Sequence, residues 1–260
     1  MNDTLTFTLI QSDLQWENTR ENLQNFEQKI KNIVGKKEVV VLPEMFTTGF
    51  SINPSKIAET MDGKTLHWMK KESREHKIIL TGSLIIQENN TFFNRQIWMQ
   101  PNELYGVYDK RHLFSMSGED KEFSAGKKKF IAQVKGWKIC TQICYDLRFP
   151  VWNRQQKESP FDVLMYIANW PTKRIYAWKT LLQARAIENQ CFVVAVNRIG
   201  TDGNGLEYCG ESCVINPMGE VILHLGNEEN IQTITLNKNE ILEAREKFPF
   251  GNDADEFIIL

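Results

Sequence analysis

The chain has 260 residues, which is enough for one large domain with a substantial core. Its 42% hydrophobic residues, 25% charged residues and formal net charge of -2 give no reason to expect a nucleic-acid or anionic-membrane partner. No apolar window approaches the roughly 20 residues that a membrane span needs. A chain of this length does not need disulfides, and its cysteines number five, so we expect free thiols in a reducing, cytoplasmic setting.

Strand and helix patterns alternate through the first half of the chain. Residues 5–11 alternate like a strand, without the basic and apolar regions of a signal peptide. Residues 16–34 carry apolar side chains at helical spacing, and residues 38–46 begin as the continuous apolar run of a buried strand. Further predicted elements are a helix near residues 65–75, strands near 77–86, 92–100 and 105–112, and a polar loop at 115–128.

The second half continues the alternation and adds a hairpin. Residues 138–144 are a predicted strand in which Cys140 and Cys144 share one face. An Asn-Pro-Met-Gly turn predicts a hairpin within residues 211–225. Further predicted elements are a strand at 161–170, a helix at 172–190, a strand at 191–200, a loop at 201–205, a strand at 231–237 and a helix at 238–248.

No linker, low-complexity segment or internal repeat divides the chain, so we expect a single domain over residues 1–260. The largely β-α alternation with hairpins favours an α/β layered sandwich. The tail, about residues 248–260, has exposed-looking apolar residues that could dock on a partner subunit.

Cys144 ends an apolar strand, and the residues after it predict a sharp turn. A side chain at such an elbow projects from the sheet edge, and backbone N–H groups beyond it can hold an oxyanion. Taken alone, a cysteine at a strand end is more often a packing residue, and Cys140 reads as core. Zinc bound by both of these and by Cys209 and Cys213 is disfavoured, because the pairs lie in strand patterns without zinc-knuckle turns.

Glu44 and Lys110 also lie at the ends of predicted strands. A solvated loop residue is the plainer interpretation of each one. However, active sites of α/β sheets collect at strand ends, so an acid, a cation and a thiol at three such positions suggest catalysis. The alternative activating group for Cys144 is His112, the only histidine in a site-like loop.

Three segments, LPEMFTTGF, YDKRHLF and CYDLRFP, resemble the signature segments of the nitrilase (carbon–nitrogen hydrolase) superfamily. Further matches are ANWP, ARAIEN, NRIGTDGNG and VINPMGE, and the likeness covers about residues 5–247. The resemblance implies a four-layer α-β-β-α sandwich that binds no cofactor or metal and forms a homodimer. It also implies that Glu44 is the general base, Lys110 the cation and Cys144 the nucleophile.

The resemblance implies a second glutamate in the loop after the lysine, seven residues before a glycine. Glu119 has this spacing from Gly126, and Glu122 is the competing choice. The segments CYDLRFPVW, ANWP and LLQARAIEN resemble those of bacterial omega-amidases, which hydrolyse the terminal amide of 2-oxo-acid amides. This implies an amidase that forms a cysteine thioester, with the backbone N–H of Tyr145 helping to hold the oxyanion.

A 2-oxo-acid amide, such as 2-oxoglutaramate or its methylthio analogue, carries a carboxylate that calls for a fixed cation. Arg148 is the candidate, and an internal ion pair with Asp146 or another acid is the equal alternative. Further pocket candidates, each of which could instead be core or turn packing, are Asn169, Trp170, Phe46 and Phe114. The alternative functions are another amide, carbamoyl or nitrile hydrolase of the superfamily, or a non-catalytic binding protein on this scaffold.

Overall fold

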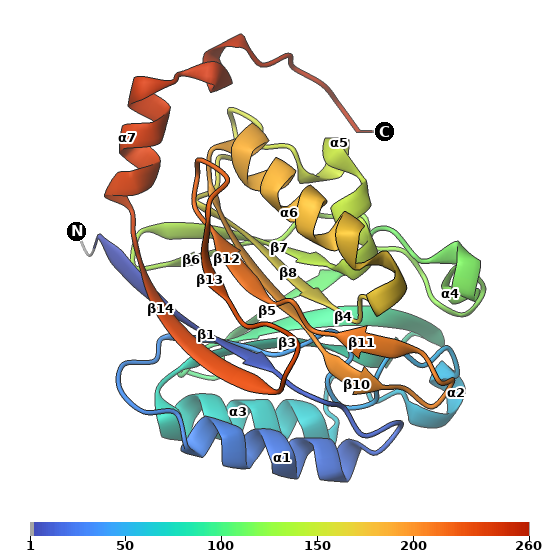
Figure 1. Ribbon diagram of the computed structural model, residues 1–260. Helices are drawn as coiled ribbons and strands as arrows, with labels where there is room; N and C mark the ends of the chain where they lie inside the picture. Colours follow the sequence, from blue (N-terminus) through green and yellow to red (C-terminus); the bar gives the residue numbers. More distant parts are fainter. Residues whose placement is uncertain (1–2, 260) are drawn as a thin grey trace.

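The computed structural model describes residues 3–259, which form two six-stranded sheets packed face to face with helices on both outer faces (Figure 1). The strands are β1 (Thr4–Gln11), β2 (Val39–Val41), β3 (Ile79–Glu88), β4 (Thr91–Met99), β5 (Tyr105–Asp109), β6 (Ile131–Val134), β7 (Trp137–Ile143), β8 (Val163–Ala168), β9 (Phe192–Asn197), β10 (Ile199–Thr201), β11 (Glu207–Cys209), β12 (Cys213–Ile215), β13 (Val221–His224) and β14 (Asn230–Asn237). The helices are α1 (Thr19–Lys31), α2 (Pro54–Ile57), α3 (Lys64–His76), α4 (Glu119–Glu122), α5 (Pro150–Asn153), α6 (Ile175–Asn189) and α7 (Asn239–Lys247).

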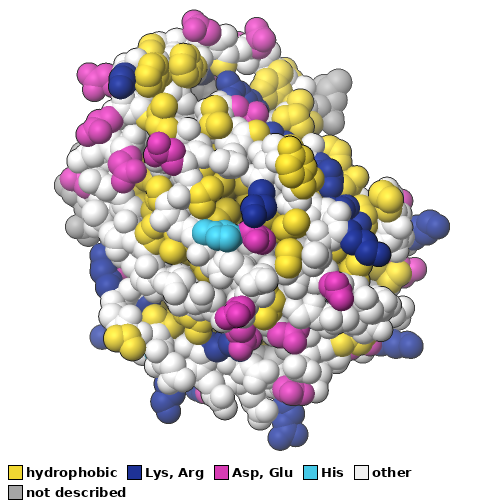
Figure 2. Space-filling view, in the orientation of Figure 1, with side chains coloured by type: hydrophobic (Ala, Val, Ile, Leu, Met, Phe, Trp, Pro, Cys, Tyr) yellow, Lys and Arg dark blue, Asp and Glu magenta, His cyan; other side chains and the backbone are white. Residues whose placement is uncertain are grey.

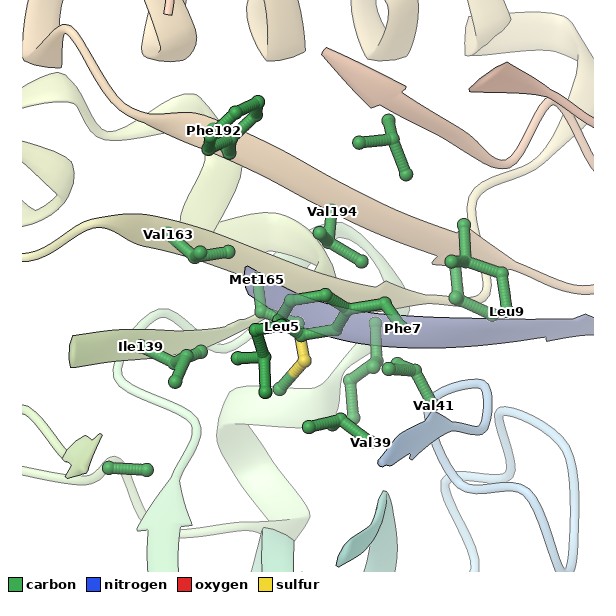
Figure 3. Packing of buried hydrophobic residues seen from close by; sticks show 14 of the residues in the cluster. Leu5, Phe7, Leu9, Val39, Val41, Ile139, Val163, Met165, Phe192 and Val194 are labelled. Atoms are coloured by element: carbon green, nitrogen blue, oxygen red, sulfur yellow. The ribbon is translucent and has the colours of Figure 1, made fainter. Parts of the chain in front are cut away.

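The first sheet has the order β14-β1-β2-β3-β4-β5 and the second β13-β12-β9-β8-β7-β6. Side chains alternate along each strand, so every strand presents one face to the other sheet and one to the helices. The central core lies between the sheets, where residues of β1 and β2 meet residues of β7, β8 and β9 (Figure 3). The labelled members of this core are Leu5, Phe7, Leu9, Val39, Val41, Ile139, Val163, Met165, Phe192 and Val194.

Helices cover the two outer faces. On the first sheet, α1 and α3 contribute Phe26, Ile30, Leu66 and Met69, at the spacing that places apolar residues on one side of a helix. On the second sheet, α6 buries Trp178 and neighbouring apolar residues. The layers therefore run α-β-β-α, which confirms the predicted sandwich.

The predicted strand over residues 191–200 is wrong at Arg198, where the chain leaves the second sheet. β9 ends at Asn197, and β10, whose last residue Thr201 was expected as loop, pairs instead with β11, which lies outside the predicted elements. The buried Arg198 Nη2 donates to Asp13 Oδ1 at 2.8 Å and to the carbonyl of Leu14 at 3.2 Å. These bonds hold the bend against the segment that follows β1.

The C-terminal segment leaves α7 and arches over the α5–α6 side of the molecule (Figure 1). Gln190 Nε2 donates to the Phe248 carbonyl at 2.7 Å, and Gln156 Nε2 donates to the Phe257 carbonyl at 3.0 Å. A cavity of about 600 Å³ lies between this arch and the 154–160 segment. None of the helices within residues 3–259 is long and apolar enough to cross a membrane.

Candidate active site

Cys144 follows the last residue of β7 and has a φ of 44°, in the left-handed region that non-glycine residues rarely adopt. The fully buried Asp146 holds this elbow in place. Its Oδ2 accepts the Ile143 N–H at 3.0 Å and the Tyr108 hydroxyl at 2.8 Å. Its Oδ1 accepts the backbone N–H of His112 at 2.9 Å, so the elbow is tied to the loop that follows Lys110.

Glu44, Lys110 and Glu119 form a fully buried cluster. The ammonium of Lys110 lies 2.9 Å from Glu44 Oε1 and 3.0 and 2.9 Å from the two carboxylate oxygens of Glu119. Glu119 Oε2 also accepts the backbone N–H of Phe114 at 2.6 Å. Glu122, the competing choice for the second acid, is exposed and outside the cluster. The two predicted acids therefore flank one cation.

Two asparagines fix the orientation of the Glu44 carboxylate. Asn94 on β4 donates to Glu44 Oε1 at 2.8 Å. The backbone N–H of Asn169, just beyond β8, donates to Glu44 Oε2 at 2.8 Å, and its side-chain amide donates to the Glu44 carbonyl at 2.7 Å. Asn94 was not among the predicted site residues, because Arg95 and Gln96 follow it in the same strand and nothing in the pattern singles it out.

The charges in the cluster shift the pKa values of its members. Burial alone would lower the pKa of Lys110, but the carboxylates of Glu119 and Glu44 raise it above its ordinary value. The pKa of Glu119 is raised, chiefly by burial and further by Glu44, while Lys110 opposes the shift. Lys110 is therefore a permanent ammonium between the two acids.

The Cys144 thiol lies beside this cluster. Its Sγ is 3.9 Å from the Asn169 carbonyl oxygen. Burial raises the pKa of Cys144 well above the usual thiol range, the charge of Glu44 adds to the shift, and Lys110 opposes it. The resting group is thus a neutral thiol, and a nucleophile at this position needs a base to remove its proton during attack.

His112 belongs to the elbow and makes no hydrogen bond to Cys144. Its Nδ1 lies 2.8 Å from Asp146 Oδ1, and its ring stacks on Phe149 with 3.7 Å between centroids. The geometry therefore does not support a Cys144–His112 pair.

A pocket of about 270 Å³ opens in front of the thiol. Lys110, Cys144 and Asn169 lie among its lining residues, and aromatic side chains provide much of its wall. Predicted residues in this lining are Tyr145, Trp170 and Phe114, whereas Trp16, Phe50 and Tyr208 were not predicted. Small polar groups among apolar walls are typical of a site for a small molecule.

The interpretation of Phe46 as a pocket wall is wrong. Its ring is fully buried on the helix-covered side of the first sheet, with centroids 5.5 Å from Phe26 and 5.9 Å from Trp68. Its alternative interpretation, as a core residue, holds. The residue that does line the pocket from the same segment is Phe50, whose ring lies 5.2 Å from Lys110 Nζ.

Arg148 lines the pocket and stacks on Trp170, with 4.9 Å from Cζ to the ring centroid. The internal ion pair with Asp146 does not form, because that carboxylate is occupied by the elbow and by His112. A second arginine, Arg174, lines the same pocket and was not predicted. It lies in a 3-10 turn before α6, and its contribution to the pocket depends on that turn.

Cys140 precedes Cys144 by four residues. It packs under α6, as expected for a core residue. Cys209 and Cys213 are free thiols. Within residues 3–259, no group of three or more histidine, cysteine or acidic side chains is placed to hold a metal ion.

Comparison with known proteins relates the chain to characterised sequences. The family model described as "Carbon-nitrogen hydrolase" matches residues 7–246. The chain is 40% identical over 254 residues to omega-amidase YafV of Escherichia coli K12, which covers 97% of this chain and 98% of the relative. It is 35% identical over 251 residues to a 2-oxoglutaramate amidase of Bacillus subtilis, which covers 95% and 96%.

A crystal structure of similar fold is that of XC1258 from Xanthomonas campestris, described as a CN-hydrolase superfamily protein with an arsenic adduct in its active site. It superposes with a TM-score of 0.95 at 40% identity, covering 98% of this chain and 99% of that one.

Proposed function

The chain belongs to the carbon–nitrogen hydrolase family, and we propose that it is an omega-amidase that releases ammonia from the terminal amide of 2-oxoglutaramate. It is a hydrolase of carbon–nitrogen bonds, as its family and its relatives are. The observation that carries the proposal is the buried Glu44–Lys110–Glu119 cluster, which adjoins a partly buried Cys144 that lines a small pocket. A binding protein has no physical need for this cluster.

In the acylation step, a Glu44 carboxylate oxygen takes the proton from the Cys144 thiol as Sγ attacks the amide carbon. The carbonyl oxygen becomes an oxyanion, which the Tyr145 N–H and the ammonium of Lys110 stabilise. One N–H of Lys110 can bridge both oxygens of Glu119, which leaves another for the oxyanion. Collapse of the intermediate breaks the carbon–nitrogen bond, and Glu44 delivers its proton to the departing ammonia.

In the deacylation step, water attacks the thioester while Glu44 again accepts a proton. The carbon–sulfur bond breaks, the proton returns to Sγ and the dicarboxylate product leaves. Glu119 acts as a positioning residue: its carboxylate holds Lys110 and, through the N–H of Phe114, the loop that forms one pocket wall. No metal or organic cofactor is needed for these steps.

The pocket's charges favour an oxo acid over an amino acid. Arg148 and Arg174 offer positive charge to a carboxylate. The lining acid outside the buried cluster is Asp202, and its oxygens already accept hydrogen bonds from the Asn204 and Leu206 N–H groups and from the Tyr208 hydroxyl. An α-ammonium group, as in glutamine, would therefore meet two arginines and, among the described lining residues, a single acid whose oxygens already accept three hydrogen bonds.

Ammonia release across a panel of amides tests the proposal. We expect the highest kcat/KM for 2-oxoglutaramate, a lower value for succinamate and little turnover of glutamine. Equal rates for glutamine and 2-oxoglutaramate would overturn the 2-oxo-acid assignment. Faster turnover of an N-carbamoyl amino acid or a nitrile would instead assign the enzyme to another reaction of the family.

We also propose that the single domain forms a homodimer through the side of α5, α6 and the C-terminal segment. Apolar side chains are prominent over this side of the surface (Figure 2). The exposed apolar residues on α5, α6 and the β12–β13 turn are Val151, Tyr176, Ile187 and Met218. Exposed apolar patches are frequent at subunit interfaces. Light scattering should give the mass of a dimer, and a stable monomer would contradict this proposal.

A cytoplasmic location stays a prediction.

A further inference from the structure

Two arginines at the pocket lack an acidic partner among residues 3–259. Across residues 3–259, the arginines that form ion pairs are Arg74, Arg95, Arg185 and Arg198. Arg148 and Arg174 are not among them, although both are partly buried and line the pocket in front of Cys144. A partly desolvated guanidinium without a carboxylate partner has hydrogen-bonding capacity that a ligand can use.

Aromatic rings hold both guanidinium groups. Arg148 lies over Trp170, as described above, and Arg174 lies over Phe114 with 5.0 Å from Cζ to the ring centroid. The Trp170 indole N–H donates to the Arg174 carbonyl at 2.8 Å, which ties the two walls together. Stacking restrains the guanidinium plane while its N–H groups remain available at the edge.

Each arginine is also linked to the catalytic machinery. Arg148 lies four residues beyond Cys144, in the 3-10 turn that forms the elbow. The Phe114 ring, over which Arg174 lies, packs edge-to-face on Tyr145 with 5.0 Å between centroids. The backbone N–H of Phe114 donates to Glu119. An anion held between the arginines would therefore be positioned relative to the thiol from both sides of the pocket.

We propose that Arg148 and Arg174 form a two-point clamp for the far end of the substrate, with Arg174 as a specificity-determining residue for the carboxylate of 2-oxo-acid amides. This inference rests on the proposed function, because it concerns the same pocket. A planar 2-oxo carboxylate presents three oxygens, which suits two forked donors better than one. The clamp selects amides that carry a carboxylate at the opposite end and discriminates against neutral amides of equal length.

Steady-state kinetics of Arg174→Gln and Arg148→Gln test the clamp, with Lys173→Gln as the matched control. Lys173 lies in the same turn as Arg174 and carries the same charge, but it is exposed and does not line the pocket. The substrates are 2-oxoglutaramate, succinamate and the neutral amide pentanamide. Ammonia release gives kcat and KM for each combination.

We expect Arg174→Gln to lower kcat/KM for 2-oxoglutaramate by about 10- to 100-fold, mainly through KM, because a hydrogen bond to a charged group is lost. Activity on pentanamide should change by less than about threefold, and Lys173→Gln should leave all three substrates nearly unchanged. Arg174→Lys should recover only part of the loss, since an ammonium lacks the forked geometry.

Equal kcat/KM for 2-oxoglutaramate in wild type and Arg174→Gln would overturn the clamp and leave the proposed function intact. A parallel loss on pentanamide would also overturn it, because the arginine would then support the site as a whole. If the wild-type enzyme hydrolyses succinamate but not 2-oxoglutaramate, the proposed function fails while the clamp is still tested on succinamate.

Discussion

Lys110 and the two clamp arginines, Arg148 and Arg174, bear the same charge in opposite surroundings. Lys110 is fully buried, and three carboxylate oxygens lie within 3.0 Å of its ammonium. The arginines are partly buried in the same pocket and contact aromatic rings instead of acids.

This difference separates chemistry from recognition. A buried ammonium between two acids is fixed before substrate arrives, so its field acts on the thiol and the oxyanion without reorganisation. An arginine without an acid can exchange water for a substrate carboxylate. The comparison predicts that removing Lys110 damages both stability and turnover, whereas removing Arg148 or Arg174 changes substrate choice.

The largest effect is expected for Lys110→Met. Without the ammonium, the Glu44 and Glu119 carboxylates are left buried and unpaired, so the free energy of unfolding should fall by about 3–5 kcal/mol. Ammonia release should also be lost. Urea denaturation measures the stability, and adding Glu119→Gln should recover part of it without recovering turnover. An unchanged free energy of unfolding in Lys110→Met would break the comparison.

Glu44→Gln should lower kcat by about 10²- to 10⁴-fold, because the amide cannot accept the proton of the Cys144 thiol. The side-chain oxygen of the glutamine can still accept hydrogen bonds from Lys110 and Asn94, and only the bond from the Asn169 N–H is lost, so the variant should still fold. Ammonia release measures the loss, and the unfolding transition serves as the control. A variant within tenfold of wild-type turnover would show that another group is the base.

The pH dependence of alkylation reports the protonation state of the Cys144 thiol, which lies between the buried cluster and the pocket. The pKa of Cys144 is raised by burial and by Glu44, so the thiolate fraction is small at neutral pH and grows as pH rises. Peptide mass spectrometry gives the rate at which iodoacetamide labels Cys144, and glutathione labelled in parallel is the reference thiol. This rate should increase from about pH 6 to about pH 9 without a plateau. A plateau below about pH 7 would indicate a stable thiolate at rest.

His112→Ala should reduce kcat by less than about tenfold, because the ring positions Asp146 and stacks on Phe149 without touching the thiol. Ammonia release from 2-oxoglutaramate provides the measurement. Complete loss of turnover in a folded variant would restore the Cys144–His112 pair as the catalytic unit.

The smallest effect is expected on the stability of Arg148→Gln and Arg174→Gln. Each substitution removes one stacked cation and no ion pair, so the free energy of unfolding should change by at most about 1 kcal/mol. Urea denaturation alongside Lys110→Met gives a direct contrast. A loss as large as that of Lys110→Met would show that the arginines are structural.

The sequence predicted the parts of the site that follow from strand ends. Glu44, Lys110 and Cys144 each come after a run of strand-forming residues, and active sites of α/β folds collect at such strand ends. Glu44 and Lys110 follow strands of the first sheet and Cys144 follows a strand of the second, so the packing of the two sheets brings them together. The sandwich followed from the β-α alternation and the resemblance together. Glu119 was separated from Glu122 only by motif spacing, whereas the structure separates them by burial.

What the sequence could not provide depends on tertiary packing. Phe46 and Phe50 are the same residue type four positions apart, and only the packing of Phe46 under α1 and α3 assigns it to the core. Arg174 reaches the pocket because of a turn before α6, which no periodic pattern predicts. The end of β9 likewise depends on the distant Asp13, which binds Arg198.

The central claim is that Cys144 is the nucleophile, and Cys140, four residues earlier in β7, provides the control. Cys140 lies in the core, where burial raises its pKa to about 11. Ammonia release from 2-oxoglutaramate should be undetectable in Cys144→Ala and largely retained in Cys140→Ala. A Cys144→Ala protein with wild-type turnover would contradict the account.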